Sequence, residues 1–155
     1  MRTPIFALSL LALAACGSKQ QMPREPVEYA WVRLPAVDGR PAAAYFTLNG
    51  GENGDRLIAI DSPRVATIEL HETMAGNGAM RMRPLDAVSV GPGEQVSFAP
   101  GGRHAMLFGA DPNLQPGTPL AINFRFDSGR DISIEATTVA AGAAAPFDEE
   151  SNGAR

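Results

Sequence analysis

The stretch Leu120–Thr138, LAINFRFDSGRDISIEATT, decides the fold class of this chain. In its first half Ile122, Phe124 and Phe126 fall on one side of an extended backbone, with a polar residue between each pair. The turn sequence DSGR then leads into a second alternating run, Asp131–Thr138. A period of two is the pattern of a half-buried strand, so the stretch predicts a β-hairpin with one face on an apolar core.

Similar short runs recur upstream, separated by turns rich in Gly, Pro, Asn and Asp, and no convincing helical period accompanies them. Many short strands at this spacing predict an all-β sandwich or barrel with Greek-key connections. The other expected strands are Tyr29–Leu34, Ala43–Leu48, Arg56–Ile60, Val65–Thr73, Ala79–Arg83, Gln95–Ala99 and His104–Phe108.

The N-terminal residues have the features of a targeting segment. Arg2 precedes the apolar run Ile5–Ala15, which is too short to span a bilayer and matches a signal peptide over residues 1–15. The run ends in LAAC, which resembles the bacterial lipoprotein box, in which Cys16 is acylated and becomes the first residue. An ordinary signal peptide followed by a free Cys16 is the alternative.

Three segments follow the expected signal peptide. Residues 16–27 contain two prolines and no apolar period, which suits a flexible tether. Residues 28–139 form the expected folded domain, and the Ala-rich, acidic residues 140–155 form an expected disordered tail. The tether includes Met22, which we interpret as a linker residue.

Composition excludes several functions. The chain has 155 residues, enough for one domain with its own core, and 13 basic against 17 acidic side chains give a net charge of −4. Without a basic cluster in the sequence, this charge argues against nucleic-acid binding and against attraction to anionic lipid. The single cysteine excludes an intramolecular disulfide.

Both histidines and four of the six methionines lie in one stretch, residues 71–106. The spacing is His71, ten residues, Met82, twenty-one residues, His104, one residue, Met106. Imidazole and thioether groups suit Cu(I), a soft ion. We therefore predict that these four side chains bind one copper ion per chain.

The spacing also predicts how the ligands meet. Asn77-Gly78 is a strong hairpin signal, and a two-residue loop there opposes Thr73 and Met82. His71 and Met82 then become diagonal neighbours on one face, about 7–8 Å apart at the backbone. His104 and Met106 are two residues apart on one strand, so they also share a face. Packing of the sheets is expected to bring the two pairs together.

Two further methionines belong to the same hairpin. Met80 falls on the face of Met82, and we leave open whether it fills space or supplies a sulfur beside, rather than on, the metal. Met74 opposes Arg81 on the other face, and we interpret it as structural. A zinc site would use thiolates, histidines or carboxylates, and a blue-copper centre needs a thiolate, so neither matches this set.

The pattern His-x₁₀-Met-x₂₁-His-x-Met resembles that of the periplasmic copper chaperones called PCuAC. The resemblance extends over about residues 29–139 and includes the blocks AWVR (30–33), AAYF (43–46), ELHE (69–72), MRMRP (80–84) and PGGRHAML (100–107). Some relatives have Met directly after the first His, where this chain has Glu72. A His/Met-rich C-terminal extension, which takes Cu(II) in other relatives, is missing from this sequence.

The resemblance implies a cupredoxin-like or Ig-like Greek-key β-sandwich that binds one Cu(I), is not an enzyme and is expected to be monomeric. It implies delivery of copper to the CuA centre of cytochrome c oxidase, commonly beside a Sco-type thiol copper protein. The expected location is the periplasmic face of a Gram-negative bacterial membrane, with a lipid anchor at Cys16. Whether that membrane is the inner or the outer one stays open.

Two other functions compete with delivery. An envelope lipoprotein with the same ligands would sequester copper as protection, and the sequence does not separate that role from delivery. A copper oxygenase with a histidine brace needs His as its first mature residue, whereas that position is expected to be Cys16 here.

Overall fold

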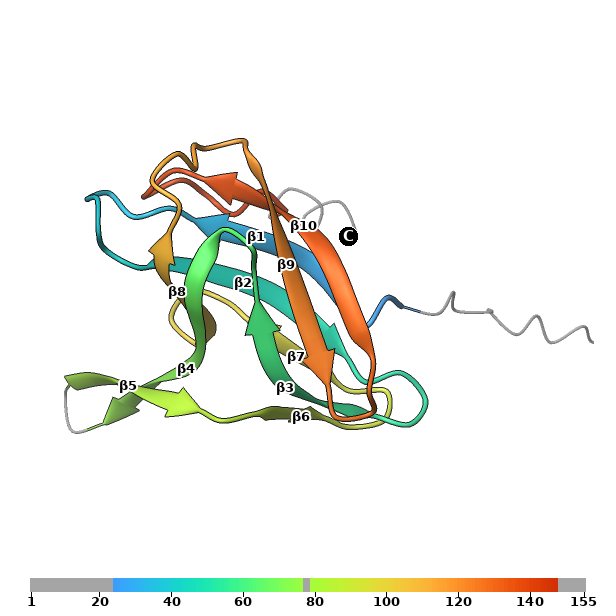
Figure 1. Cartoon of the computed structure of the whole chain (residues 1–155). Helices are drawn as coiled ribbons and strands as arrows, with labels where there is room; N and C mark the ends of the chain where they lie inside the picture. The colour runs from blue at the N-terminus through green and yellow to red at the C-terminus, as the bar shows by residue number, and fades with distance from the viewer. Residues whose placement is uncertain (1–23, 77–78, 148–155) are drawn as a thin grey trace, which may run out of the picture.

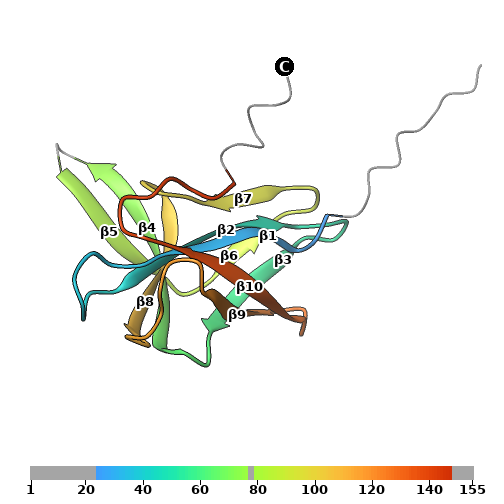
Figure 2. The same cartoon turned by 90° about the horizontal axis from the view of Figure 1, so that it is seen from above.

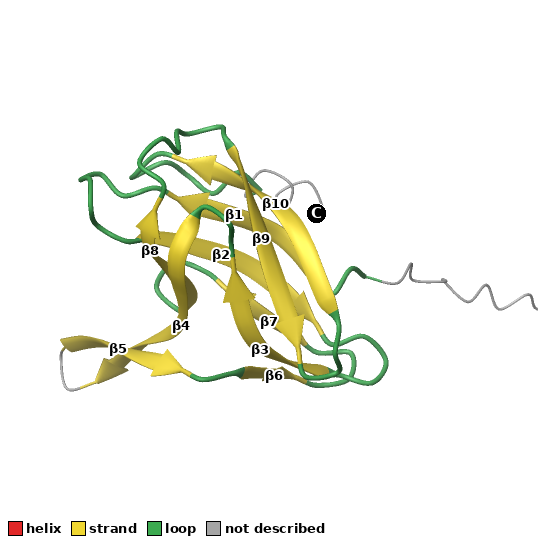
Figure 3. Cartoon of the chain, viewed as in Figure 1, coloured by secondary structure: helices red, strands yellow, loops and turns green. Residues whose placement is uncertain are grey.

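The computed structural model of this chain describes residues 24–76 and 79–147, which form ten strands and no helix (Figure 3). The prediction of an all-β fold is confirmed. No helix in this part of the chain is long and apolar enough to cross a membrane. The expected signal peptide, Cys16 and the Asn77-Gly78 loop lie outside the described residues. The strands are β1 (Val27–Arg33), β2 (Ala42–Asn49), β3 (Asp55–Asp61), β4 (Val65–Gly76), β5 (Ala79–Leu85), β6 (Val88–Val90), β7 (Gln95–Phe98), β8 (Arg103–Ala110), β9 (Pro119–Phe126) and β10 (Asp131–Val139).

All nine strands expected from the sequence are present, with ends that differ by at most a few residues. The strand β6, only three residues long, was not expected. The first strand begins at Val27 rather than Tyr29, because Val27 is buried and opposes Leu48 of β2.

The strands form one sheet in the order β5-β4-β8-β7-β2-β1-β10-β9-β3-β6, with a further pairing between β8 and β2 (Figure 1). The sheet folds over on itself. Phe46 of β2 and Phe124 of β9 have ring centroids 4.9 Å apart, although two strands separate β2 from β9 in the order. In a flat sheet three steps between strands would span about 14 Å. The apolar core therefore lies between two layers of one continuous sheet.

The hairpin that predicts the fold class has the expected register. Asp131 opposes Arg125 and Ile134 opposes Ile122, so the apolar residues of β9 and β10 share one face. That face is on the core, since Leu120, Ile122, Phe124 and Phe126 are almost fully buried.

Asp55, at the start of β3, connects that strand to the turn of the β9–β10 hairpin. The carboxylate of Asp55, only 3% exposed, accepts hydrogen bonds from the Ser128 hydroxyl (2.7 Å) and the Arg130 guanidinium (2.8 Å). Burial alone would raise the pKa of Asp55, but these bonds and those from the backbone N–H groups of Arg56 and Ser128 lower it from 3.8 to about 2. The turn of β9–β10 is thus fixed to β3 by an ionised carboxylate.

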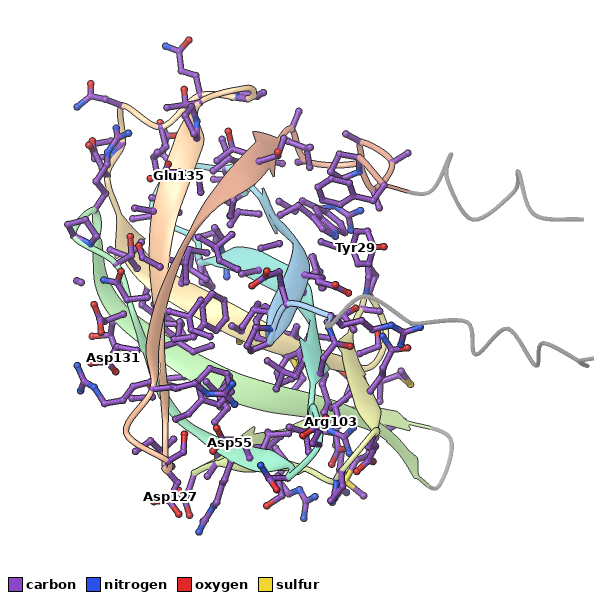
Figure 4. All side chains as sticks on the ribbon, turned by 90° about the vertical axis from the view of Figure 1, so that its right-hand side faces the viewer. Tyr29, Asp55, Arg103, Asp127, Asp131 and Glu135 are labelled. Carbon is purple, nitrogen blue, oxygen red and sulfur yellow. The ribbon has the colours of Figure 1, made fainter. Side chains whose placement is uncertain are left out.

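The chain after β10 lies against the outside of β1. The Arg33 guanidinium donates to the carbonyl of Ala143 at 2.9 Å, and the ring of Phe147 meets that of Tyr29, labelled in Figure 4, edge to face at 5.7 Å. Residues 140–147 therefore have contacts with the domain, where the sequence predicted a disordered tail.

Candidate metal centre

The hairpin of β4 and β5 has the register predicted from its turn sequence. Gly76 opposes Ala79 beside the loop, and Thr73 opposes Met82. His71 opposes Pro84, which makes His71 and Met82 diagonal neighbours on one face, as expected.

The strand β8 brings the second pair of side chains to the same place. His104 lies directly opposite His71, and Met106 lies opposite Glu69. The two imidazole rings face each other with centroids 6.0 Å apart and planes inclined by 26°. The expected meeting by packing of one sheet on another is corrected: β4 and β8 are neighbours within one sheet, and their antiparallel register aligns the histidines.

All four predicted ligands lie on the outer face of three adjacent strands, β5, β4 and β8. The alternate residues Leu70, Ala105 and Leu107 point to the opposite face and are buried in the core. Because opposed residues in a sheet share a face, His71, His104, Met106 and Met82 all project away from the core. The core thus fixes the backbone that carries the ligands without covering them.

The exposed fraction of the side chain differs among the four predicted ligands. His71 is the most enclosed member, with a side chain 13% exposed, while His104 and Met106 are half-buried. Met82 is 59% exposed, because β5 has no further strand beside it among the described residues. An ion held here would lie near the surface, with Met82 on its open side.

The other methionines of the hairpin occupy different positions. Met80 is 65% exposed and opposes Ala75, so it shares the face of Met82 but lies two residues nearer the loop. Met74 is also exposed and opposes Arg81 on the other face. It is therefore separated from the histidines by the ribbon of the hairpin itself.

In each histidine a hydrogen bond occupies one ring nitrogen and leaves the other one open to a metal ion. Nδ1 of His104 lies 3.1 Å from the carbonyl oxygen of Gly102, which accepts only, so Nδ1 carries the proton and Nε2 keeps a lone pair. Nε2 of His71 donates to the Glu69 carboxylate at 2.9 Å, which leaves the lone pair on Nδ1. That Nδ1 is buried and has no hydrogen-bond partner among the described residues. A soft metal ion fits a site with such an unpaired nitrogen beside thioethers.

Two of these contacts were missed in reading the sequence. Glu69 is two residues before His71, and strand alternation alone places it on the same face. The Gly102 carbonyl also accepts from the backbone N–H of Thr73 at 3.1 Å, and thereby joins the turn before β8 to β4. Only the register between two distant strands reveals that second contact.

Glu72, which follows the first histidine, points to the opposite face. Its carboxylate is 2.8 Å from the Arg83 guanidinium and 3.3 Å from that of Arg103. The hydrogen bond from Arg83 lowers the pKa of Glu72 below its ordinary value, so the carboxylate stays ionised in this ion pair. The Glu at this position therefore does not compete with the four predicted ligands.

Other metal chemistry has little support in the described residues. They contain no group of three or more His, Cys, Asp or Glu side chains arranged to hold a metal ion. A hollow of about 420 Å³ lies at the far end of β8, lined by Leu34, Arg40, Asp111 and Leu114 among others, and includes none of the four residues. Metal binding at the histidines is therefore not expected to rest on a cluster of histidine and carboxylate side chains.

These observations define a class of protein: a β-sandwich domain that gathers two imidazoles and two thioethers on its outer face. The chain belongs to the family described as "Putative lipoprotein LpqE-like", whose model matches residues 26–138. It is 30% identical over 139 residues to "Putative lipoprotein Lxx21020" of Leifsonia xyli subsp. xyli, covering 83% of each chain. It is 35% identical over 88 residues to "Uncharacterized protein RP573" of Rickettsia prowazekii, covering 56% of this chain and 49% of that relative.

Solved structures share the fold. The copper-bound PCuAC domain from PmoF2 matches with a TM-score of 0.62 and 23% identity over 74% of this chain and 91% of that domain. The solution structure of Cu(I)-DR1885 from Deinococcus radiodurans matches with a TM-score of 0.56 and 24% identity over 78% of this chain and 81% of that chain. The predicted cupredoxin-like or Ig-like β-sandwich is confirmed by this likeness, which at such identities concerns the fold alone.

Proposed function

We propose that this chain is a copper chaperone that binds one Cu(I) through His71, Met82, His104 and Met106. The observation that carries the proposal is the direct opposition of His71 and His104, with a methionine beside each on the same outer face. Thioethers bind Cu(I) without losing a proton, and the two neutral imidazoles supply the remaining lone pairs. The names of the solved domains that share this fold, which include copper-bound forms, support the choice of metal.

We propose that the protein is a copper carrier and not an enzyme. The only cysteine of the sequence is Cys16, so the site lacks the thiolate of a copper electron-transfer centre. Without a thiolate the ligand set favours Cu(I) over Cu(II), which disfavours redox cycling. The exposed Met82 gives a partner access to the ion, which then leaves by ligand exchange.

We propose delivery toward the CuA centre of cytochrome c oxidase, with the oxidase subunit or a Sco-type thiol copper protein as the receiver. A thiolate binds Cu(I) more tightly than a thioether, so transfer to such a partner is downhill. The proposed location is the periplasmic face of a Gram-negative bacterial membrane, with Cys16 as the lipid anchor. The lipoprotein names of the family and of the Leifsonia relative support the anchor.

X-ray absorption at the copper edge tests the ligand set. The chain from residue 17 onward, loaded with one equivalent of Cu(I), is expected to show a mixed nitrogen and sulfur shell. Met82→Leu combined with Met106→Leu should remove the sulfur, whereas the matched control Met22→Leu with Met74→Leu should keep it. An unchanged shell in the first pair, or failure of the unmodified chain to bind Cu(I), contradicts the proposal.

Deletion of the gene separates delivery from sequestration. Delivery predicts loss of oxidase assembly, which excess copper restores. Loss of copper tolerance with normal oxidase assembly would instead assign the site to sequestration.

A further inference from the structure

We propose that the open edge of β5 is a docking strand for an extended, acidic segment of a partner protein, which pairs with it backbone to backbone. The hairpin of β4 and β5 projects away from the other strands in Figures 1 and 2, and β5 ends the strand order. Every residue from Ala79 to Pro84 is exposed. This inference deepens the proposed function. It rests on that function only for the identity of the cargo, Cu(I), that the partner receives.

The backbone of β5 offers a ladder of free hydrogen-bonding groups along this edge. Pro84 has no N–H, so the pair that it forms with His71 is of the type that exchanges no hydrogen bonds. Such pairs alternate along an antiparallel ladder, so the pair Thr73 and Met82 is of the same type. The N–H of Thr73 confirms this, since it donates to Gly102, on the side of β4 away from β5. The N–H and C=O groups of Met80 and Met82 therefore point outward from the sheet.

The side chains beside this edge carry positive charge on one face. Arg81 and Arg83 alternate with the methionines and lie on the face away from the predicted ligands. Arg103, labelled in Figure 4, approaches Glu72 from β8 on that same face. Two guanidinium groups thus share the Glu72 carboxylate, and a third, that of Arg81, has no ion pair within the described residues. In a chain of net charge −4 this cluster is a local exception that attracts carboxylates.

The combination selects a polypeptide rather than another partner. Lipid headgroups have no ladder of alternating donors and acceptors that matches a strand edge, whereas an extended peptide does. A second copy of this chain is disfavoured, because antiparallel pairing about Met82 would set Arg81 opposite Arg83, and like charges in that position repel. An acidic segment of a different protein can pair with the free backbone groups of β5 and can also place carboxylates beside the arginines.

Strand alternation connects docking to the cargo. In a strand added to β5, every second side chain lies beside Arg81 and Arg83, where carboxylates fit. The side chains between them lie beside Met80 and Met82, on the face of the predicted copper ligands. Soft donors at those positions would meet the exposed Met82, on the open side of the site. One added strand therefore both docks the partner and aligns its ligands for exchange.

The test uses the metal-free chain from residue 16 with Cys16→Ser, and a ten-residue peptide of alternating Glu and Thr as the probe. Hydrogen exchange followed by NMR is expected to slow at the amides of Met80 and Met82 when the peptide is added. A peptide of alternating Lys and Thr should protect these amides at least about fivefold less, because the cross-strand charge pairs become repulsive. Exchange at both amides that neither peptide alters, or that both slow equally, would overturn the proposal.

A charge-reversal variant and a matched control sharpen the test. Arg81→Glu with Arg83→Glu should reverse the preference between the two peptides. Arg40→Glu with Arg56→Glu, which reverses two exposed arginines elsewhere, should leave the preference as it is. Self-association of the metal-free chain through β5, or attachment to anionic vesicles that the Arg81 and Arg83 changes abolish, would assign the edge to another occupant and overturn the proposal.

Copper binding by the same variants keeps the two proposals distinguishable. Competition with a Cu(I) chelator should give unchanged affinity for the Arg81 and Arg83 variant, because neither side chain lies on the ligand face. Docking without copper binding would contradict the proposed function alone. Copper binding without docking would contradict this inference alone.

Discussion

Two antiparallel hairpins of this molecule have similar strand geometry but different roles. In β9–β10 the apolar residues of one face lie on the core, where Phe124 and Phe126 are almost fully buried and Ile132 and Ile134 are partly buried. In β4–β5 every residue from Ala79 to Pro84 is exposed, and the hairpin extends past Glu72 and Arg103, the final pair of β4 with β8. The first hairpin stabilises the sandwich, whereas the second presents side chains to solvent. Strand formation and strand burial are thus separate outcomes of the sequence.

The largest expected contrast between the hairpins is in stability. Phe124→Ala removes a buried ring that packs 4.9 Å from Phe46, and it should lower the free energy of unfolding by about 3–5 kcal/mol. Met82→Leu, at a residue 59% exposed, should change it by less than about 0.5 kcal/mol. Urea unfolding of both variants measures the contrast. Similar losses would show that the β4–β5 hairpin shares in the core.

A smaller effect is expected at the turn of the buried hairpin, and it depends on pH. The folded-state pKa of Asp55, about 2, lies below the ordinary 3.8, so its ionised form stabilises the fold above pH 4. That contribution, about 2 kcal/mol, is lost as the pH falls through about 4 toward 2. Asp55→Asn should be less stable at pH 7 and show a flatter acid dependence.

Acid unfolding followed by circular dichroism measures this difference. Asp127→Asn, an exposed acid in the same turn, provides the matched control and should behave as the unmodified chain does. An Asp55→Asn variant with the acid profile of the unmodified chain would show that the hydrogen bonds at this turn do not stabilise the fold.

The smallest expected effect concerns the side chain that positions His71. Glu69→Gln removes the carboxylate that accepts from Nε2, so His71 is held less firmly with Nδ1 available. Cu(I) affinity should fall about tenfold, while the free energy of unfolding changes by less than about 0.5 kcal/mol. Chelator competition measures the affinity, and Glu135→Gln, an exposed acid on β10, is the control. Equal affinities in the two variants would exclude a positioning role for Glu69.

Much of the fold was predictable because it rests on local pattern. Alternation identified nine of the ten strands, and the Asn77-Gly78 turn gave the register of β4 with β5 correctly. The strand β6 was missed, since three residues, Val88–Val90, are too few to show a period. The contacts of residues 140–147 were missed as well, because an Ala-rich composition gives no sign of the groups that Arg33 and Tyr29 offer.

The sequence predicted each of the two pairs of ligands, but not the strand register that brings the pairs together. Spacing within a hairpin or a strand placed His71 with Met82 and His104 with Met106, because those residues are close in the chain. The pairing of β4 with β8 joins residues more than thirty positions apart, and no local pattern fixes such a register. The hydrogen bond between Thr73 and Gly102 depends on that register, so it could not be predicted from the sequence either.

One NMR titration tests the central claim that a single Cu(I) binds between the two histidines. The chain carries ¹⁵N-labelled imidazoles, and Cu(I) is added from zero to two equivalents. We predict that His71 and His104 respond together, that both responses are complete at one equivalent, and that the larger shifts are at Nδ1 of His71 and Nε2 of His104. A response at only one histidine, or responses that continue to the second equivalent, would contradict a shared site.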